Sequence, residues 1–191
     1  MPLSAYILYF TTVLIWGSTW LAIKFQLGAV DPLVSVVYRF GLASVLLFAW
    51  CFLARARLRL TPREHVFIAL QGVCLFGLNY WVIYWAEVYL TSGVVAVIFA
   101  TMVFMNFFNA ALFLKRPLVP VVLVGGLIGL AGVALLFWPE FGSLGLDGGA
   151  LRGLLLALGA TYLASLGNIV ATRNAGFGLK VITVNAWGMF Y

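Results

Sequence analysis

Long apolar runs constrain the fold of this chain more than any other feature. Six of them, each about 20 residues long, lie at roughly 5–23, 33–54, 66–86, 88–114, 118–138 and 153–172. A transmembrane helix needs about 20 mainly apolar residues. Because the runs are continuous rather than alternating, they indicate helices and not the strands of a barrel. The sequence therefore predicts an all-α multi-pass membrane protein.

The composition supports the same conclusion. Of the 191 residues, 65% are hydrophobic and 8% are charged, whereas a soluble domain has about 25% charged residues. The lipid bilayer is therefore the expected surrounding of most of the chain. The net charge of +6 does not indicate a nucleic-acid partner, because the basic residues lie between the apolar runs, where membrane topology places them.

The basic residues of the links predict the orientation. Counted along the chain, eight bases fall on one side and two on the other: Arg55, Arg57, Arg59, Arg63, Lys115, Arg116, Arg173 and Lys180 against Lys24 and Arg152. Since cytoplasmic loops carry an excess of Lys and Arg, the N-terminus is expected in the cytoplasm. The predicted location is the plasma membrane, and a bacterial inner membrane is favoured.

One arginine, Arg39, lies inside the second run rather than in a link. It is the seventh residue of that run and so lies about 9 Å from its outer end. Ser35 and Ala43 share its helical face, and such small residues favour a face toward other helices or a cavity. Arg39 is therefore a candidate for the substrate path. The alternatives are that its long side chain reaches back to the lipid headgroups, or that it pairs with a carbonyl or carboxylate group inside the bundle.

Aromatic and polar residues of the first and third runs are further candidates for the substrate path. Trp16, Thr19 and Trp20 lie within about one helical turn of each other. They either form one wall of a cavity or make ordinary packing contacts with other helices. The third run contributes Asn79, Tyr80 and Tyr84, which need hydrogen-bond partners if they are buried. A cavity with water or substrate would supply such partners.

The remaining candidates each have two interpretations. Asn106 either joins the substrate path or links helices by hydrogen bonds. Glu87 is the acidic residue nearest the interior of a run, which makes it a candidate proton carrier, the alternative being a solvated outer carboxylate. Gly125 and Gly129 form a small-xxx-small pair, which predicts close contact with another helix or with a second protomer in a homo-oligomer.

Motifs of enzymes and pumps are missing. The single histidine, His65, lies at a helix end, and no H-E-x-x-H motif, paired aspartates or phosphate-binding loop occurs. No catalytic residue, metal site or cofactor is therefore predicted, and the chain is not expected to be an enzyme.

The order of several segments resembles a known family. The segments "IWGSTWLAIKF" and "YRFGLASVLLF", then "NYWVIYWAEVYLTSGVVAVIFATMVF" and a glycine-rich fifth run, are similar to the first repeat of the EamA-like permeases of the drug/metabolite transporter superfamily. The resemblance implies ten helices in two inverted five-helix repeats that move small metabolites without ATP. Two departures are Val103, where the family often has proline, and Lys115–Pro117, where it tends to have Gly-Glu-Arg.

The resemblance also implies a division of the chain and a function. Residues 1–139 would form the first five-helix repeat, 140–152 an external link, and 153–191 the start of the second repeat. The last apolar run starts near Val181 and is too short to span, so either the C-terminus is truncated, which is the simpler interpretation, or the last helix is re-entrant. The predicted function is a secondary transporter, preferably an exporter, of small organic metabolites such as amino acids or carboxylated compounds, by alternating access. The alternative is a non-transporting membrane scaffold or an inactive truncated product.

Overall fold

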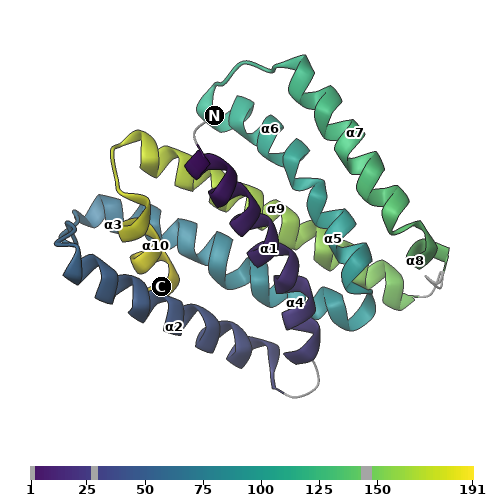
Figure 1. The fold of residues 1–191 in the computed structure, drawn as a ribbon, viewed down its shortest axis with the longest axis horizontal. Coiled ribbons are helices and arrows are strands. Elements are labelled where there is room, and N and C mark those ends of the chain that lie inside the picture. The colour runs from purple at the N-terminus through teal and green to yellow at the C-terminus, as the bar shows by residue number, and fades with distance from the viewer. Residues whose placement is uncertain (1–2, 27–29, 143–147) are drawn as a thin grey trace.

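The computed structural model describes residues 3–26, 30–142 and 148–191, apart from the side chains of Trp20, Lys24, Gln26 and Glu140. These residues form helices joined by short connections (Figure 1). The helices are α1 (Leu3–Gln26), α2 (Pro32–Leu53), α3 (Pro62–Gly72), the π-helix η1 (Val73–Gly77), α4 (Leu78–Tyr89), α5 (Ser92–Ala100), α6 (Met102–Leu114), α7 (Pro120–Leu136), α8 (Trp138–Gly142), α9 (Gly148–Gly176) and α10 (Val181–Phe190). The predicted external link, 140–152, lies partly outside the described residues.

The predicted all-α multi-pass membrane fold is confirmed. Five helical stretches of the described chain are long and apolar enough to cross a membrane: Leu3–Ile23, Pro32–Leu53, Pro62–Tyr89, Ser92–Leu114 and Gly148–Gly176. The predicted fifth run is the apolar helix α7, which is shorter than the run because the separate helix α8 follows it. The run that starts at Val181 forms α10.

Local capping explains where two of the spans begin. Asp31 precedes α2, and its side chain accepts a hydrogen bond of 2.8 Å from the backbone N–H of Leu33. Thr61 and Glu64 form a capping box at the start of α3, so the helix satisfies donors that would otherwise lack a partner. Proline occupies the first position of both helices, where its missing N–H costs nothing. These signals fix the residues at which α2 and α3 begin.

The third span is not one regular α-helix, which the apolar pattern did not predict. Residues Val73–Gly77 form a π-helical turn between α3 and α4. A π-turn inserts one extra residue into the helix and often occurs at functional sites. Gly77 has ψ −90 instead of the helical value, which marks the point where the ordinary helix resumes. Side chains on α4 are therefore rotated relative to those on α3.

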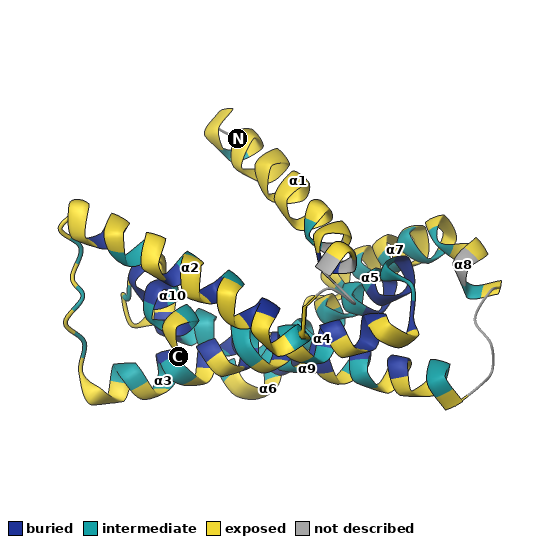
Figure 2. Cartoon of the chain, turned by 90° about the horizontal axis from the view of Figure 1, so that it is seen from below, coloured by how far each residue is buried: buried dark blue, intermediate teal, exposed yellow. Residues whose placement is uncertain are grey.

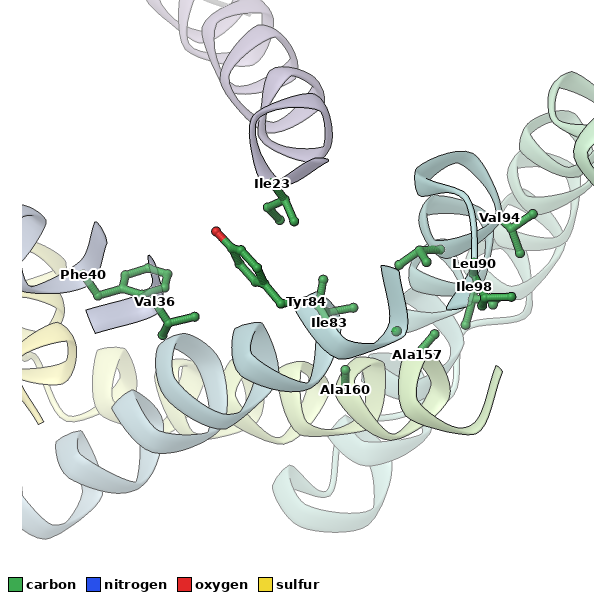
Figure 3. Packing of buried hydrophobic residues seen from close by; sticks show 12 residues of the cluster. Ile23, Val36, Phe40, Ile83, Tyr84, Leu90, Val94, Ile98, Ala157 and Ala160 are labelled. Atoms are coloured by element: carbon green, nitrogen blue, oxygen red, sulfur yellow. The ribbon is translucent and has the colours of Figure 1, made fainter. Parts of the chain in front are cut away.

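The core lies where α4 runs along α9. Figure 3 shows its side chains: Ile83 of α4 lies near Ala160 of α9, Tyr84 points from α4 toward Ile23, and Leu90, Val94 and Ile98 continue toward α5. Small residues on α9 make this approach close. A Cβ added at Gly167 of α9 would lie 2.8 Å from the Cβ of Leu75, in the neighbouring π-helix η1, so only glycine fits there.

Helix α10 packs between α2 and α3, while α1 stands apart from the bundle over much of its length (Figure 2). The hydroxyl of Ser44 donates a hydrogen bond of 2.8 Å to the carbonyl oxygen of Ala186, which joins α2 to α10. On the other side of α10, a Cβ added at Gly72 would lie 2.0 Å from the carbonyl oxygen of Gly188. The backbones of α3 and α10 are thus in direct contact.

Candidate functional site

A cavity of about 510 Å³ lies between helices from both ends of the sequence. It is bounded by α1, α2, the π-turn with α4, the α5–α6 junction, α9 and the end of α10. The lining residues are Thr12, Ile15, Trp16, Thr19, Arg39, Phe40, Ala43, Leu75, Phe76, Asn79, Tyr80, Phe99, Met102, Ala164, Asn168 and Met189. Five of the residues predicted for the substrate path therefore lie around one space: Trp16, Thr19, Arg39, Asn79 and Tyr80.

Arg39 faces this cavity. Its Nη2 donates a long hydrogen bond of 3.4 Å to the hydroxyl of Thr19. Its guanidinium carbon lies 4.8 Å from the centre of the Tyr80 ring and 5.4 Å from that of Phe40, within the range of cation–π attraction. The guanidinium also interacts with the Tyr84 side chain. Arg39 therefore points toward the first and third spans, as expected from its small-residue face, and its place in a substrate path stays a prediction.

Arg39 sets the electrostatics of the cavity. It is the single charged side chain among the lining residues that the structure describes, and none of them is acidic. The rest of the surface is aromatic or aliphatic, with amides from Asn79 and Asn168. Within the described lining, the guanidinium is therefore the one group that could pair with an anion.

Helix α1 contributes the wall opposite α9. Thr19 donates a hydrogen bond of 3.0 Å to the carbonyl oxygen of Ile15, so its oxygen can also accept the bond from Arg39. Trp16 is 46% exposed and also borders a smaller neighbouring cavity of about 270 Å³, together with Phe99 and Met102. The side chain of Trp20 lies outside the described part of the structure.

The residues predicted from the third span differ in their surroundings. Asn79 lines the cavity, but its amide donates a hydrogen bond of 2.6 Å to the carbonyl oxygen of Ala160 and so joins α4 to α9. Tyr80 lines the cavity directly beside Arg39. Tyr84 does not line it: the ring rises from α4 toward Ile23 of α1 and is part of the core (Figure 3).

Asn106 does not line the cavity either. Its Oδ1 is buried and has no hydrogen-bond partner among the described residues. The neighbouring amide of the same helix, Asn109, donates a hydrogen bond of 2.8 Å to the hydroxyl of Ser165 and so joins α6 to α9. Asn168 of α9 takes a place in the wall, where its amide is 3.4 Å from the sulfur of Met102. The amide that reaches the cavity from this region is thus on α9 rather than on α6.

Glu87 and the glycine pair lie away from the cavity. Glu87 is only 8% exposed, near the end of α4, and its carboxylate acts electrostatically on Tyr84. A solvated carboxylate is therefore not what the structure shows. Gly125 and Gly129 have no described atom within 4 Å of an added Cβ, whereas Gly126 faces Phe104 and Val103 of α6. Within this chain the close contact is made by Gly126, and contact with a second protomer stays a prediction.

Sequence reasoning missed a second polar layer, beyond the π-turn from the cavity. The amide of Asn174 donates a hydrogen bond of 3.0 Å to Gln71, and the amide of Gln71 donates one of 3.4 Å to Asn185. Gln71 and Asn174 are almost fully buried. These bonds join α3, α9 and α10. Gln71, a glutamine inside an apolar run, was the signal in the sequence that could have revealed this layer, because a buried amide requires hydrogen-bond partners.

No metal centre is apparent in the part of the chain that the structure describes. Residues 3–26, 30–142 and 148–191 contain no group of three or more His, Cys, Asp or Glu side chains arranged to hold an ion. Cys51 and Cys74 are both buried free thiols.

Known proteins resemble the chain over most of its length. Protein PagO of Salmonella typhimurium is 28% identical over 110 residues, which are 58% of this chain and 36% of PagO. The uncharacterized transporter YoaV of Bacillus subtilis is 27% identical over 178 residues, 93% of this chain and 60% of YoaV. An uncharacterized transporter of Archaeoglobus fulgidus is 25% identical over 157 residues, 81% of this chain and 52% of that protein. No solved structure matches the chain.

The chain spans between 36% and 60% of the length of these three relatives. The profile of the EamA-like transporter family matches residues 3–138, from the start of α1 to the start of α8. That segment holds the first five predicted spans and most of the residues around Arg39. On this match and on its all-helical membrane fold, the chain belongs to the EamA-like transporter family.

Proposed function

We propose that the protein is a secondary transporter of small organic metabolites that carry a carboxylate or another anionic group. The observation that carries this proposal is the placement of Arg39 in a cavity of about 510 Å³ between helices of both parts of the chain. A guanidinium can hold a carboxylate through two parallel hydrogen bonds. The aromatic side chains around it provide apolar contact for the rest of a small molecule.

Different residues around the cavity contact different parts of the substrate. Arg39 pairs with the anionic group, and Thr19 and Tyr80 hold the guanidinium at the edge of the space. Trp16 and Phe99 form an apolar wall, and the amide of Asn168 offers a hydrogen-bond donor and acceptor. Such a mixed wall suits amino acids and other carboxylated metabolites better than lipophilic cations.

The transport cycle follows from the expected repeats. Residues 1–139 form the first five-helix repeat and 153–191 the start of the second, and one repeat rocks against the other around the cavity. The N-terminus lies in the cytoplasm of a bacterial inner membrane, and export is the preferred direction. The eight-to-two distribution of basic residues supports this orientation.

Transport measured in cells tests the proposal. Cells that produce the protein are loaded with a panel of amino acids, carboxylic acids and neutral analogues, and release is compared with that of cells carrying an empty vector. Removing a charge-assisted hydrogen bond costs about 1.5–3 kcal/mol. Arg39→Ala should therefore raise the half-saturating concentration of an anionic substrate roughly 10- to 100-fold.

Two variants control for effects on folding. Arg39→Lys keeps the charge and should retain part of the transport, while Arg152→Gln removes an exposed charge at the far end of α9 and should behave as the wild type. Unchanged transport by Arg39→Ala, at equal protein level in the membrane, would refute the role of Arg39. Equal release from vector cells for every compound would refute transport itself.

A further inference from the structure

A second cavity, of about 280 Å³, lies outside the substrate path. Its walls come from α3, η1, α6 and α9, and it shares no lining residue with the cavity around Arg39. It is lined by Leu70, Cys74, Phe113, Leu114, Leu166, Ile169, Val170 and Arg173. Leu70 and Phe113 are exposed on the outer surface of the bundle. The cavity therefore opens at the outer surface of the described helices.

Arg173 is the one charged side chain among these lining residues. Its guanidinium lies against the rings of Phe67 and Phe177, 3.3 and 4.5 Å from their centres, and donates a hydrogen bond of 3.3 Å to Asn174. Among the described residues no carboxylate forms an ion pair with Arg173; the ion pair found among them joins Arg57 to Glu64 in another part of the structure. The positive charge is thus held in a fixed place at an apolar cavity, without an anion.

Two more basic residues directly follow a lining residue of this cavity in the sequence. Lys115 and Arg116 come immediately after Leu114, and both are exposed. Lys115 ends α6 in the left-handed conformation, with φ 52, so the chain turns at the rim of the cavity instead of continuing along the helix axis. Three basic residues therefore accompany seven uncharged lining residues at this end of the bundle.

We infer that this cavity binds a phospholipid with an anionic headgroup. One acyl chain lies along Leu70, Leu166 and Val170, and the phosphate and headgroup lie at Arg173 with Lys115 and Arg116 beside them. The cavity suits both parts of such a lipid, because its apolar side chains can contact an acyl chain and its basic residues can pair with the anionic headgroup. Basic sites between transmembrane helices bind anionic headgroups in the same manner. The inference does not depend on the transport function.

Binding of two lipids with identical acyl chains tests it. The purified protein in detergent is titrated with phosphatidylglycerol or phosphatidylcholine, and bound lipid is counted by native mass spectrometry. Each basic residue near the headgroup contributes about 1 kcal/mol, so phosphatidylglycerol should bind at least about five-fold more tightly. Arg173→Gln should reduce the preference for phosphatidylglycerol by about five-fold, and Arg173→Lys should keep it.

Two further variants separate a site from general charge attraction. Val170→Phe fills the cavity while leaving every charge in place, and it should weaken binding of both lipids. Arg59→Gln removes an exposed charge from the link between α2 and α3 and should leave the preference unchanged. Equal binding of the two lipids by the wild type, no effect of Val170→Phe, or displacement by millimolar inorganic phosphate alone would each overturn the inference.

Discussion

The contact between α3 and α10 gives the sharpest stability prediction. Gly72 and Gly188 bring the two backbones so close that a Cβ at position 72 would lie 2.0 Å from the carbonyl oxygen of Gly188. Ordinary contacts begin at 3.4 Å, so in Gly72→Ala the helices must separate by about 1.4 Å. Because the obstacle is backbone, no side-chain rotation can relieve it.

The expected cost follows from what that separation disturbs. Helix α10 is held to α2 by the bond from Ser44 to Ala186, and to α3 by the bond between Gln71 and Asn185. Overpacking in a close contact costs about 1–3 kcal/mol, and an unmet buried hydrogen bond costs a similar amount. Alanine recovers about 1 kcal/mol through its better helix propensity. We therefore expect Gly72→Ala to be destabilised by about 1–5 kcal/mol.

Thermal unfolding of the purified protein in detergent, followed by circular dichroism, measures the effect. Gly125→Ala is the matched control, because the same methyl group enters a helix where no described atom lies within 4 Å. It should be as stable as the wild type or more stable, while Gly72→Ala should melt at a lower temperature. If the two variants melted together, α3 and α10 would not be in backbone contact, and the reasoning would fail.

Two more predictions concern buried polar groups. If Glu87, which is buried beside Tyr84, carries the coupled proton, Glu87→Gln should abolish the dependence of transport on a pH gradient. Transport that still follows the gradient would exclude Glu87 as the proton carrier. Asn174→Leu breaks the bond to Gln71 and leaves a buried amide without its donor, so it should lower stability by about 1–3 kcal/mol in the same unfolding assay. A variant that unfolds like the wild type would show that the amide layer contributes no stability.

The sequence was sufficient to predict the spans and the direction of Arg39. Apolar runs report helices reliably because the bilayer demands length and composition together. Arg39 could be placed because Ser35 and Ala43 lie on its face, and a small-residue face seldom points at lipid. Both signals are local, so a single sequence contains them.

The rest depended on contacts between distant segments. The π-turn at Val73–Gly77 has no local signature in an apolar run, so the rotation of Asn79 and Tyr80 could not be predicted. Asn106 was the predicted amide of the substrate path, and only the crossing of α6 and α9 decides that the amide of Asn168 reaches the cavity instead. For the same reason the chosen glycines were Gly125 and Gly129, although Gly126 makes the contact with α6.

The π-turn also bears on how relatives of this chain can change length. An α-helix turns by about 100° per residue, so one additional residue changes the direction of every side chain that follows it. The wider turn of Val73–Gly77 takes up one extra residue, so deleting one residue there would restore a regular helix and leave Tyr80 directed toward Arg39, whereas inserting one in the regular helix after it would swing Tyr80 away by about a quarter turn. Substitutions within this turn should therefore be tolerated far better than an insertion of one residue between it and Tyr80. The number of residues between the turn and Tyr80, more than the identity of the turn residues, keeps Tyr80 directed toward Arg39.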